Sequence, residues 1–286
     1  MARATSMTAN EQRPAKARKV HTALALKDRH CLFCLADDGP FRGEEHVVPR
    51  VLGPNTDQFT IPPGVVCDPC NSWLGRQVDA PFTDRFDIRL TRGLEGLRGR
   101  SGRPLHTIEG RDATALLELE IEGGKVEIYA ARADPSPDGG LDIEIRPQQR
   151  DPPDVVARTI RALWKIALGA IWLRDGPEVL DPKYDALRLA VLGAPFNGYL
   201  LQAPFVVRVT RRLDVNVGID RPENPWAMTF ILGGVALAVP LTEGAPVRPK
   251  DAKEHGWEVR STRATAPSSI RLRLEPTDPV DLKTIE

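Results

Sequence analysis

The chain has 286 residues, of which 41% are hydrophobic and 27% charged, enough for one large globular domain or two ordinary ones. Its 39 basic and 39 acidic side chains give no net charge, and residues 1–103 carry only a mild basic excess. That excess suits a polyanionic partner but does not by itself argue for nucleic acid. The most apolar run, Trp226–Leu241, is too short to span a membrane, so we expect no membrane partner.

Residues 1–25 are polar and basic and lack both hydrophobic periodicity and the apolar core of a signal peptide. We interpret them as a disordered basic tail. Its Lys and Arg residues offer contacts to nucleic acid, although a solvated terminus is the simpler interpretation.

Two pairs of cysteines follow, each with two residues between its thiols: Cys31 with Cys34, and Cys67 with Cys70. This spacing suits four thiolates on one tetrahedral zinc ion, with redox-active thiols as the alternative. No cysteine remains for a disulfide framework, which favours a reducing, cytoplasmic location. Because four thiolates would fill the zinc coordination shell, any metal-assisted catalysis needs a second ion.

A histidine, His46, lies in the segment between the two pairs. The run Glu45–Pro49 predicts a short strand that ends at the proline. A long loop, a second short strand at Val65-Val66 and a helix from Asp68 onward are expected next. A zinc ion at the cysteines would bring the start of this helix close to the histidine.

Three side chains of this segment suit phosphodiester hydrolysis. The His46 imidazole can take a proton from water. The Glu45 carboxylate and the Asn71 carboxamide offer oxygen ligands of the kind that Mg²⁺ or Mn²⁺ prefers, and Glu44 competes with Glu45 for that role. An activated water and a cation that neutralises phosphate oxygens are the two functions that this hydrolysis requires.

The segment from Cys31 to Asp79 resembles the zinc-fastened branch of the HNH (ββα-metal) endonucleases in spacing, residue type and order. The resemblance implies that His46 is the general base and that Glu45 and Asn71 bind a catalytic Mg²⁺ or Mn²⁺. It also implies that the cysteines hold a structural zinc ion: Cys31, Cys34, Cys67 and Cys70.

The segment departs from the family pattern at three places. Glu45 stands where aspartate or histidine is common, and Val48 replaces the second histidine of some relatives. Many relatives carry an asparagine just before the second cysteine pair that orients the base, but residues 64–66 are Gly-Val-Val here. Asn55 or Asp57 would have to reach the base through the loop.

Arginine and aromatic side chains surround these residues. Arg50 and Arg76 are candidates for binding phosphate, with a plain surface role equally compatible with the sequence. Trp73 is expected to pack rather than to stack on a base. Asp79 is expected to make a structural hydrogen bond.

Residues 83–104 place six arginines among four glycines, a composition that we interpret as a basic linker. Residues 105–286 have the pattern of an α+β domain without a recognisable catalytic motif. Its expected elements are a hairpin over 115–130, a strand at 141–145, helices over 154–171 and 181–192, and strands within 204–219, 227–241 and 268–274.

The predicted fold class is therefore α+β, with an N-terminal HNH module over residues 26–82 followed by a larger α+β domain. The predicted function is hydrolysis of phosphodiester bonds in nucleic acid, DNA in preference to RNA, with a divalent ion and a histidine base. The alternative is a non-catalytic zinc module that binds nucleic acid or protein. A third hypothesis makes the larger domain a ligand sensor that licenses the nuclease. The sequence does not indicate an oligomeric state.

Overall fold

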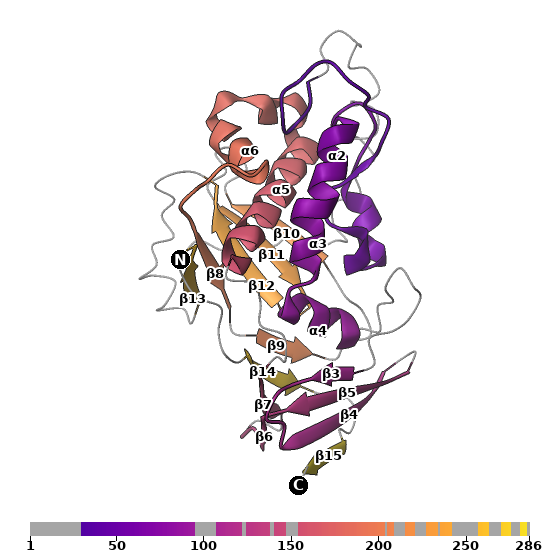
Figure 1. The fold of residues 1–286 in the computed structure, drawn as a ribbon, viewed down its shortest axis with the longest axis vertical. Helices are drawn as coiled ribbons and strands as arrows, with labels where there is room; N and C mark the ends of the chain where they lie inside the picture. The colour runs from indigo at the N-terminus through magenta and orange to yellow at the C-terminus, as the bar shows by residue number, and fades with distance from the viewer. Residues whose placement is uncertain are drawn as a thin grey trace.

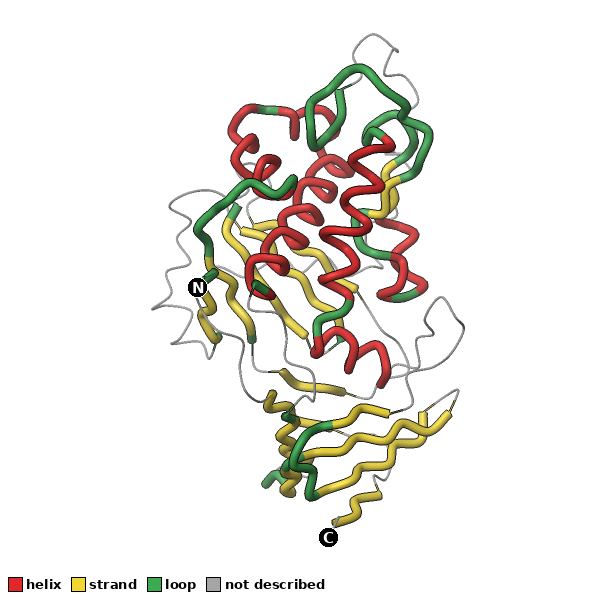
Figure 2. Tube along the Cα trace, viewed as in Figure 1, coloured by secondary structure: helices red, strands yellow, loops and turns green. Residues whose placement is uncertain are grey.

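The structure is a computed structural model of the whole chain. It describes residues 30–94, 107–121, 124–137, 140–146, 154–203, 205–208, 215–220, 227–233, 235–241, 257–262, 270–275 and 281–284. The predicted N-terminal tail and the second half of the predicted linker lie outside these residues. The described part combines helices and sheets, which confirms the predicted α+β class (Figures 1 and 2).

The N-terminal module begins with two short antiparallel strands, β1 (Glu45–His46) and β2 (Thr60–Ile61). The loop between them contains two 3₁₀ turns, Arg50–Leu52 and Pro54–Phe59. The second strand was expected at Val65-Val66, and that prediction is wrong. These two valines are buried in a bend, where they fill the core of the module rather than pair with β1.

A nearly continuous helical segment completes the module. It consists of α2 (Asp68–Leu74), a π-helical turn at Gly75–Asp79, and α3 (Ala80–Thr83). Pro69 stands in the first turn of α2, where its missing N–H is no loss. Leu74, Val78 and Phe82 are fully buried along this segment, so one face of it packs into the protein.

Residues that were expected to belong to a linker form a further helix, α4 (Phe86–Leu94). Ile88 and Leu90 are buried, and apolar burial outweighs the low helix propensity of nearby glycines. At its start, the buried Arg85 donates to Asp87, to Thr159 Oγ1 (2.9 Å) and to Gln202 Oε1 (3.3 Å). The first part of the predicted linker is thus a packed element.

A five-stranded antiparallel sheet, in the order β10-β11-β12-β8-β13, packs against the helices. Strands β11 and β12 pair as antiparallel neighbours, with Leu232 opposite Val235, in agreement with the strands expected within 227–241. The strands are β8 (Tyr199–Gln202), β10 (Val215–Asp220), β11 (Ala227–Leu232), β12 (Val235–Pro240) and β13 (Glu258–Ser261).

Two four-stranded sheets lie at the other end of the molecule (Figure 1). One has the order β15-β4-β5-β3: β15 (Asp281–Thr284), β4 (Ala115–Ile121), β5 (Gly124–Ala130) and β3 (Thr107–Glu109). The other has the order β6-β7-β14-β9: β6 (Arg132–Pro135), β7 (Leu141–Ile145), β14 (Ile270–Glu275) and β9 (Phe205–Arg208). The predicted β4–β5 hairpin and the strand at 141–145 are confirmed; the hairpin turn at 122–123 lies outside the described residues.

The longest helix, α5 (Val155–Asp175), packs between the N-terminal module and the five-stranded sheet. One side contacts the five-stranded sheet, and another contacts α3 and the π-helical turn of the N-terminal module (Figure 1). The shorter α6 (Asp185–Val191) packs on α5 and ends before Gly193, whose φ is +106°. Among the described residues, no helix has the length and apolarity needed to cross a membrane.

Gly169 of α5 lies against Val47, the residue that follows β1, and leaves no room for a larger side chain. A Cβ at Gly169 would lie 2.6 Å from Val47 Cγ2 and 2.9 Å from Val47 Cγ1. Because the stiff Val47 side chain is buried, we expect Gly169→Ala to destabilise the protein by about 1–3 kcal/mol despite its better helix propensity. Chemical denaturation measures this change.

Gly75→Ala is the matched control, since nothing lies within 4 Å of a Cβ there and the backbone is helical. It should be neutral or stabilise the protein by up to about 1 kcal/mol. Equal effects of the two substitutions would contradict the tight contact between α5 and Val47.

Candidate active site and metal centre

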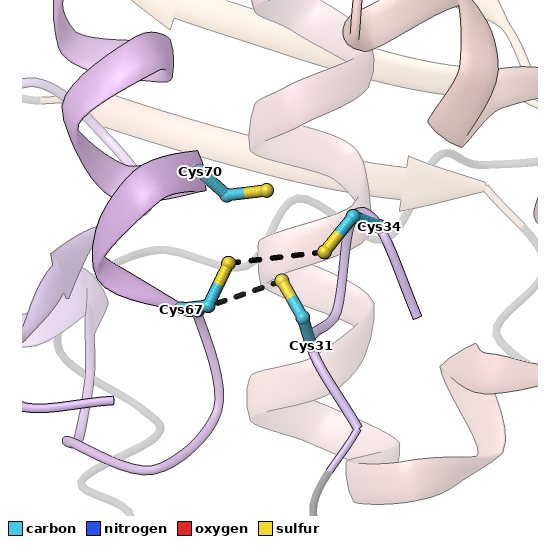
Figure 3. Close-up of side chains that lie close together, drawn as sticks. All are labelled: Cys31, Cys34, Cys67 and Cys70. Carbon is cyan, nitrogen blue, oxygen red and sulfur yellow. Dashed lines mark hydrogen bonds between the residues drawn. The ribbon is translucent and has the colours of Figure 1, made fainter. Parts of the chain in front are cut away.

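The four cysteines meet at one point. Cys31 and Cys34 come from the loop before β1, and Cys67 and Cys70 come from the start of α2, with the side chains of the two pairs facing each other (Figure 3). All four sulfur atoms lie within 4.8 Å of one another, and Cys34 Sγ and Cys67 Sγ are 3.7 Å apart. Zinc–sulfur bonds of about 2.3 Å in a tetrahedron place sulfurs about 3.8 Å apart, so the arrangement fits a structural zinc ion.

The surroundings of Cys31 favour a thiolate. Its pKa is lowered to about 4, chiefly by a hydrogen bond from the Cys70 thiol and, against the cost of burial, by backbone N–H groups. The Cys67 amide, for example, lies 3.5 Å from Cys31 Sγ. Thiolates bind zinc, so this donor pattern suits the metal.

Zinc removal should therefore unfold the module. We expect about one zinc ion per chain by elemental analysis, and loss of that ion in Cys67→Ser, because structural zinc contributes on the order of 10 kcal/mol to folding in small zinc modules. Circular dichroism on addition of a strong chelator measures the loss of structure. Ser72→Ala, an exposed change on the same helix, should keep the metal; a zinc-free wild type would contradict the assignment.

Neighbouring elements hold the two cysteine-bearing segments in place. The buried Arg188 of α6 donates from Nε to the Leu32 carbonyl at 3.1 Å. On the other side, Asp68 Oδ1 accepts hydrogen bonds from the backbone N–H groups of Arg42 (2.8 Å) and Gly43 (3.1 Å). The loop before β1 is thus fastened to the start of α2 by a carboxylate as well as by the cysteines.

His46 stands at the end of β1 and is partly exposed. Its Nδ1 lies 3.2 Å from Thr60 Oγ1 on the paired strand β2. Burial, and next the positive charge of Arg50, lower the pKa of His46 below its usual 6.5. The imidazole is therefore neutral at neutral pH, with one ring nitrogen oriented by Thr60 and the other able to accept a proton.

Glu45, the preceding residue, points to the opposite side of the strand and is 3% exposed. Its Oε1 lies 2.5 Å from Nζ of Lys165, a residue of α5 whose side chain is fully buried. The same ammonium lies 3.2 Å from Asp79 and donates to the carbonyls of His46 (2.5 Å) and Val47 (3.3 Å). Burial alone would lower the pKa of Lys165, but the two carboxylates raise it, so the group carries its charge.

Asn71 contacts the residue that precedes Glu45. Its side-chain amide donates to the Glu44 carbonyl at 2.8 Å, and its backbone N–H continues the helix by donating to Cys67. Glu44 itself is exposed. Asn71 therefore ties the start of α2 to the residue that precedes Glu45.

The remaining candidates are placed as follows. Arg50 is exposed and lies 3.6 Å from Asp57, and Arg76 is exposed on the π-helical turn. Trp73 packs against the core beside Gly193, in agreement with the expected packing role. Asp79 pairs with Lys165, in agreement with the expected structural role, and burial raises its pKa to about 6.

A divalent catalytic ion does not fit the Glu45 carboxylate in this arrangement. Glu45 Oε1 and Asp79 Oδ1 are buried without a hydrogen bond of regular geometry, but the cation that faces both is the Lys165 ammonium. A metal ion on the same carboxylate would lie against a like charge in a medium of low dielectric constant, at a large energetic cost.

Neither Lys165 nor Thr60 is indicated as a site residue by its sequence context. Lys165 lies in an apolar helix, where a lysine ordinarily reaches toward solvent, and it is 119 residues from His46. A correct prediction of the β1–β2 pairing would have identified Thr60 as a neighbour of His46, because the two residues are directly opposite each other.

The comparisons with known proteins agree with the site geometry. The family described as HNH endonuclease matches residues 31–87, which include both cysteine pairs, His46 and the helical segment through α3. No curated protein and no solved structure matches the chain. The match indicates nuclease activity at the level of the family. Residues 31–87 therefore form a domain of the HNH endonuclease type, with four cysteines positioned to bind a metal ion.

Proposed function

We propose that the chain hydrolyses phosphodiester bonds of nucleic acid, with DNA as the preferred substrate and His46 as the general base. The observation that carries the proposal is the neutral His46 imidazole, held by Thr60 at a partly exposed strand end within an HNH-type domain. Arg50 and Arg76 are proposed phosphate contacts, because both are exposed cations on the same module.

In this mechanism, His46 removes a proton from a water molecule next to the scissile phosphate. The water oxygen then forms a bond to phosphorus while the bond from phosphorus to the 3′ oxygen breaks. The products are a 5′-phosphate and a 3′-hydroxyl, and the 3′ oxygen takes its proton from solvent. Mg²⁺ and Mn²⁺ belong to the proposal through the family, with Asn71 as the proposed oxygen ligand.

The pH dependence of cleavage follows from the lowered pKa of His46. A base is active when it is unprotonated, so cleavage is lost as the pH falls through the pKa of His46 and is fully present above it. We expect a plateau at neutral pH and a fall of about tenfold per pH unit below a midpoint under 6.5. Initial rates in buffers of constant ionic strength measure the profile; a midpoint well above 6.5 would contradict the neutral imidazole.

The test of the function is a nicking assay on supercoiled plasmid, single-stranded DNA and RNA with Mg²⁺, Mn²⁺ or chelator. The proposal expects divalent-dependent cleavage, fastest on DNA, with 5′-phosphate ends that a ligase can seal. Binding without cleavage under every condition would instead support the non-catalytic zinc module.

The four free thiols at metal-binding spacing also lead us to propose a reducing compartment such as the cytoplasm. In an oxidising compartment, sulfurs as close as those of Cys34 and Cys67 would be prone to form a disulfide.

A further inference from the structure

The contacts of Lys165 connect the C-terminal part of the chain to the strand that carries His46. Its ammonium has three N–H donors, and the carbonyls of His46 and Val47 and the carboxylate of Asp79 accept from it. The Glu45 carboxylate lies at 2.5 Å as a further anionic neighbour. All of these partners belong to the HNH-type domain, whereas Lys165 belongs to α5.

The direction of β1 decides which side chains can act together. Successive strand residues point to opposite faces, so the buried Glu45 and the partly exposed His46 lie on different sides of β1. The inner side holds Lys165 and Asp79, and the outer side holds Thr60. A cation bound to the Glu45 carboxylate would thus lie behind the strand, away from the imidazole face that meets solvent.

The buried ammonium of Lys165 needs a nearby anion to offset the cost of removing its charge from water. An unpaired ammonium in the interior is costly, and Glu45 at 2.5 Å is a nearer carboxylate than Asp79 at 3.2 Å, so a metal ion on Glu45 would compete with Lys165 for its closest counter-ion. The backbone contacts of Lys165 then fix the carbonyl of His46 itself.

We propose that Glu45 is the counter-ion of Lys165 and not a ligand of the catalytic metal ion, and that Lys165 is a positioning residue for His46. This inference rests on the proposed function for its activity readout. The α+β part of the chain then completes the nuclease site, because its helix α5 supplies Lys165, the cation that contacts the Glu45 carboxylate and the His46 carbonyl of β1.

The experiment uses the full chain with Lys165→Met, Glu45→Gln and the double variant. Lys165→Met leaves two buried carboxylates without a cation and the His46 carbonyl without its donor, so cleavage should fall by at least tenfold. The double variant removes one unpaired carboxylate but does not restore the donor, so it should regain melting temperature relative to Lys165→Met while cleavage stays low. Glu45→Gln alone should reach half-maximal cleavage at the wild-type Mn²⁺ concentration, within twofold. Lys183→Met, which removes an exposed lysine, is the matched control.

Two results would overturn the inference: a double variant no more stable than Lys165→Met, or a tenfold higher Mn²⁺ requirement in Glu45→Gln. If Lys165→Met is recovered unfolded, a folded double variant supports the counter-ion role and an unfolded one refutes it. If the wild type cleaves nothing, the proposed function falls, and histidine-labelled NMR decides the positioning role. The His46 ring signals should then move in both Lys165→Met and the double variant; unmoved signals would refute it.

Discussion

Replacing His46 by Ala is expected to reduce divalent-dependent cleavage by at least about 100-fold, because a positioned general base contributes about 10²–10⁴ to the rate. The methyl group cannot take a proton, whereas the four cysteines and the contacts of Lys165 remain in place. The side chain of His46 is partly exposed, so its removal leaves no large cavity. Initial nicking rates at saturating substrate measure the effect.

The loss must occur without unfolding, so zinc content and melting temperature are measured on the same samples. Gln77→Ala changes an exposed side chain of the same domain and should cleave at the wild-type rate. Should His46→Ala cut as fast as the wild type while retaining zinc, the general-base role would be untenable.

Replacing Lys165 by Met is expected to cost about 3–5 kcal/mol of stability, the usual result of removing one partner of a buried ion pair. Glu45, Asp79 and two backbone carbonyls lose their common donor. For a chain of this size, the loss corresponds to a fall in melting temperature of roughly 10 °C. Burial already raises the pKa of Asp79 to about 6, so Asp79 can take up a proton and soften the loss.

Thermal denaturation followed by circular dichroism measures this change, with Lys183→Met as the control. The Nζ of Lys183 lies over the Tyr184 ring at 5.1 Å in an exposed position, so its removal should shift the melting temperature by less than about 2 °C. Similar melting temperatures for the two methionine variants would show that the buried cluster contributes little.

Much of the fold is predictable from hydrophobic periodicity. The alternation at 115–130 and 227–240 leads directly to the two hairpins, and the apolar spacing after Asp154 leads to α5. The prediction is wrong where burial decides against the local pattern. Val65-Val66 has strand propensity but fills the core of the module, and Phe86–Leu94 is a helix although glycines and arginines surround it.

The candidate site is predictable in the same partial way. Spacing alone indicates the cysteine cluster, since its four members are the only cysteines and form two regular pairs. The partner of Glu45 is not predictable, because a carboxylate before a histidine is equally suited to a metal ion and to a lysine. Only the packing of α5 against the module distinguishes them, and that packing is a contact between distant parts of the chain.

The order in which the ribosome makes these residues has its own consequence. Asp79 leaves the exit tunnel 86 residues ahead of Lys165, an interval of roughly 4–17 s at usual translation speeds. During that time the nascent chain contains both carboxylates without the ammonium that neutralises them. The nascent chain can therefore bring its two cysteine pairs together early. The strand β1, which carries His46, gains its contact with Lys165 only after α5 has been synthesised.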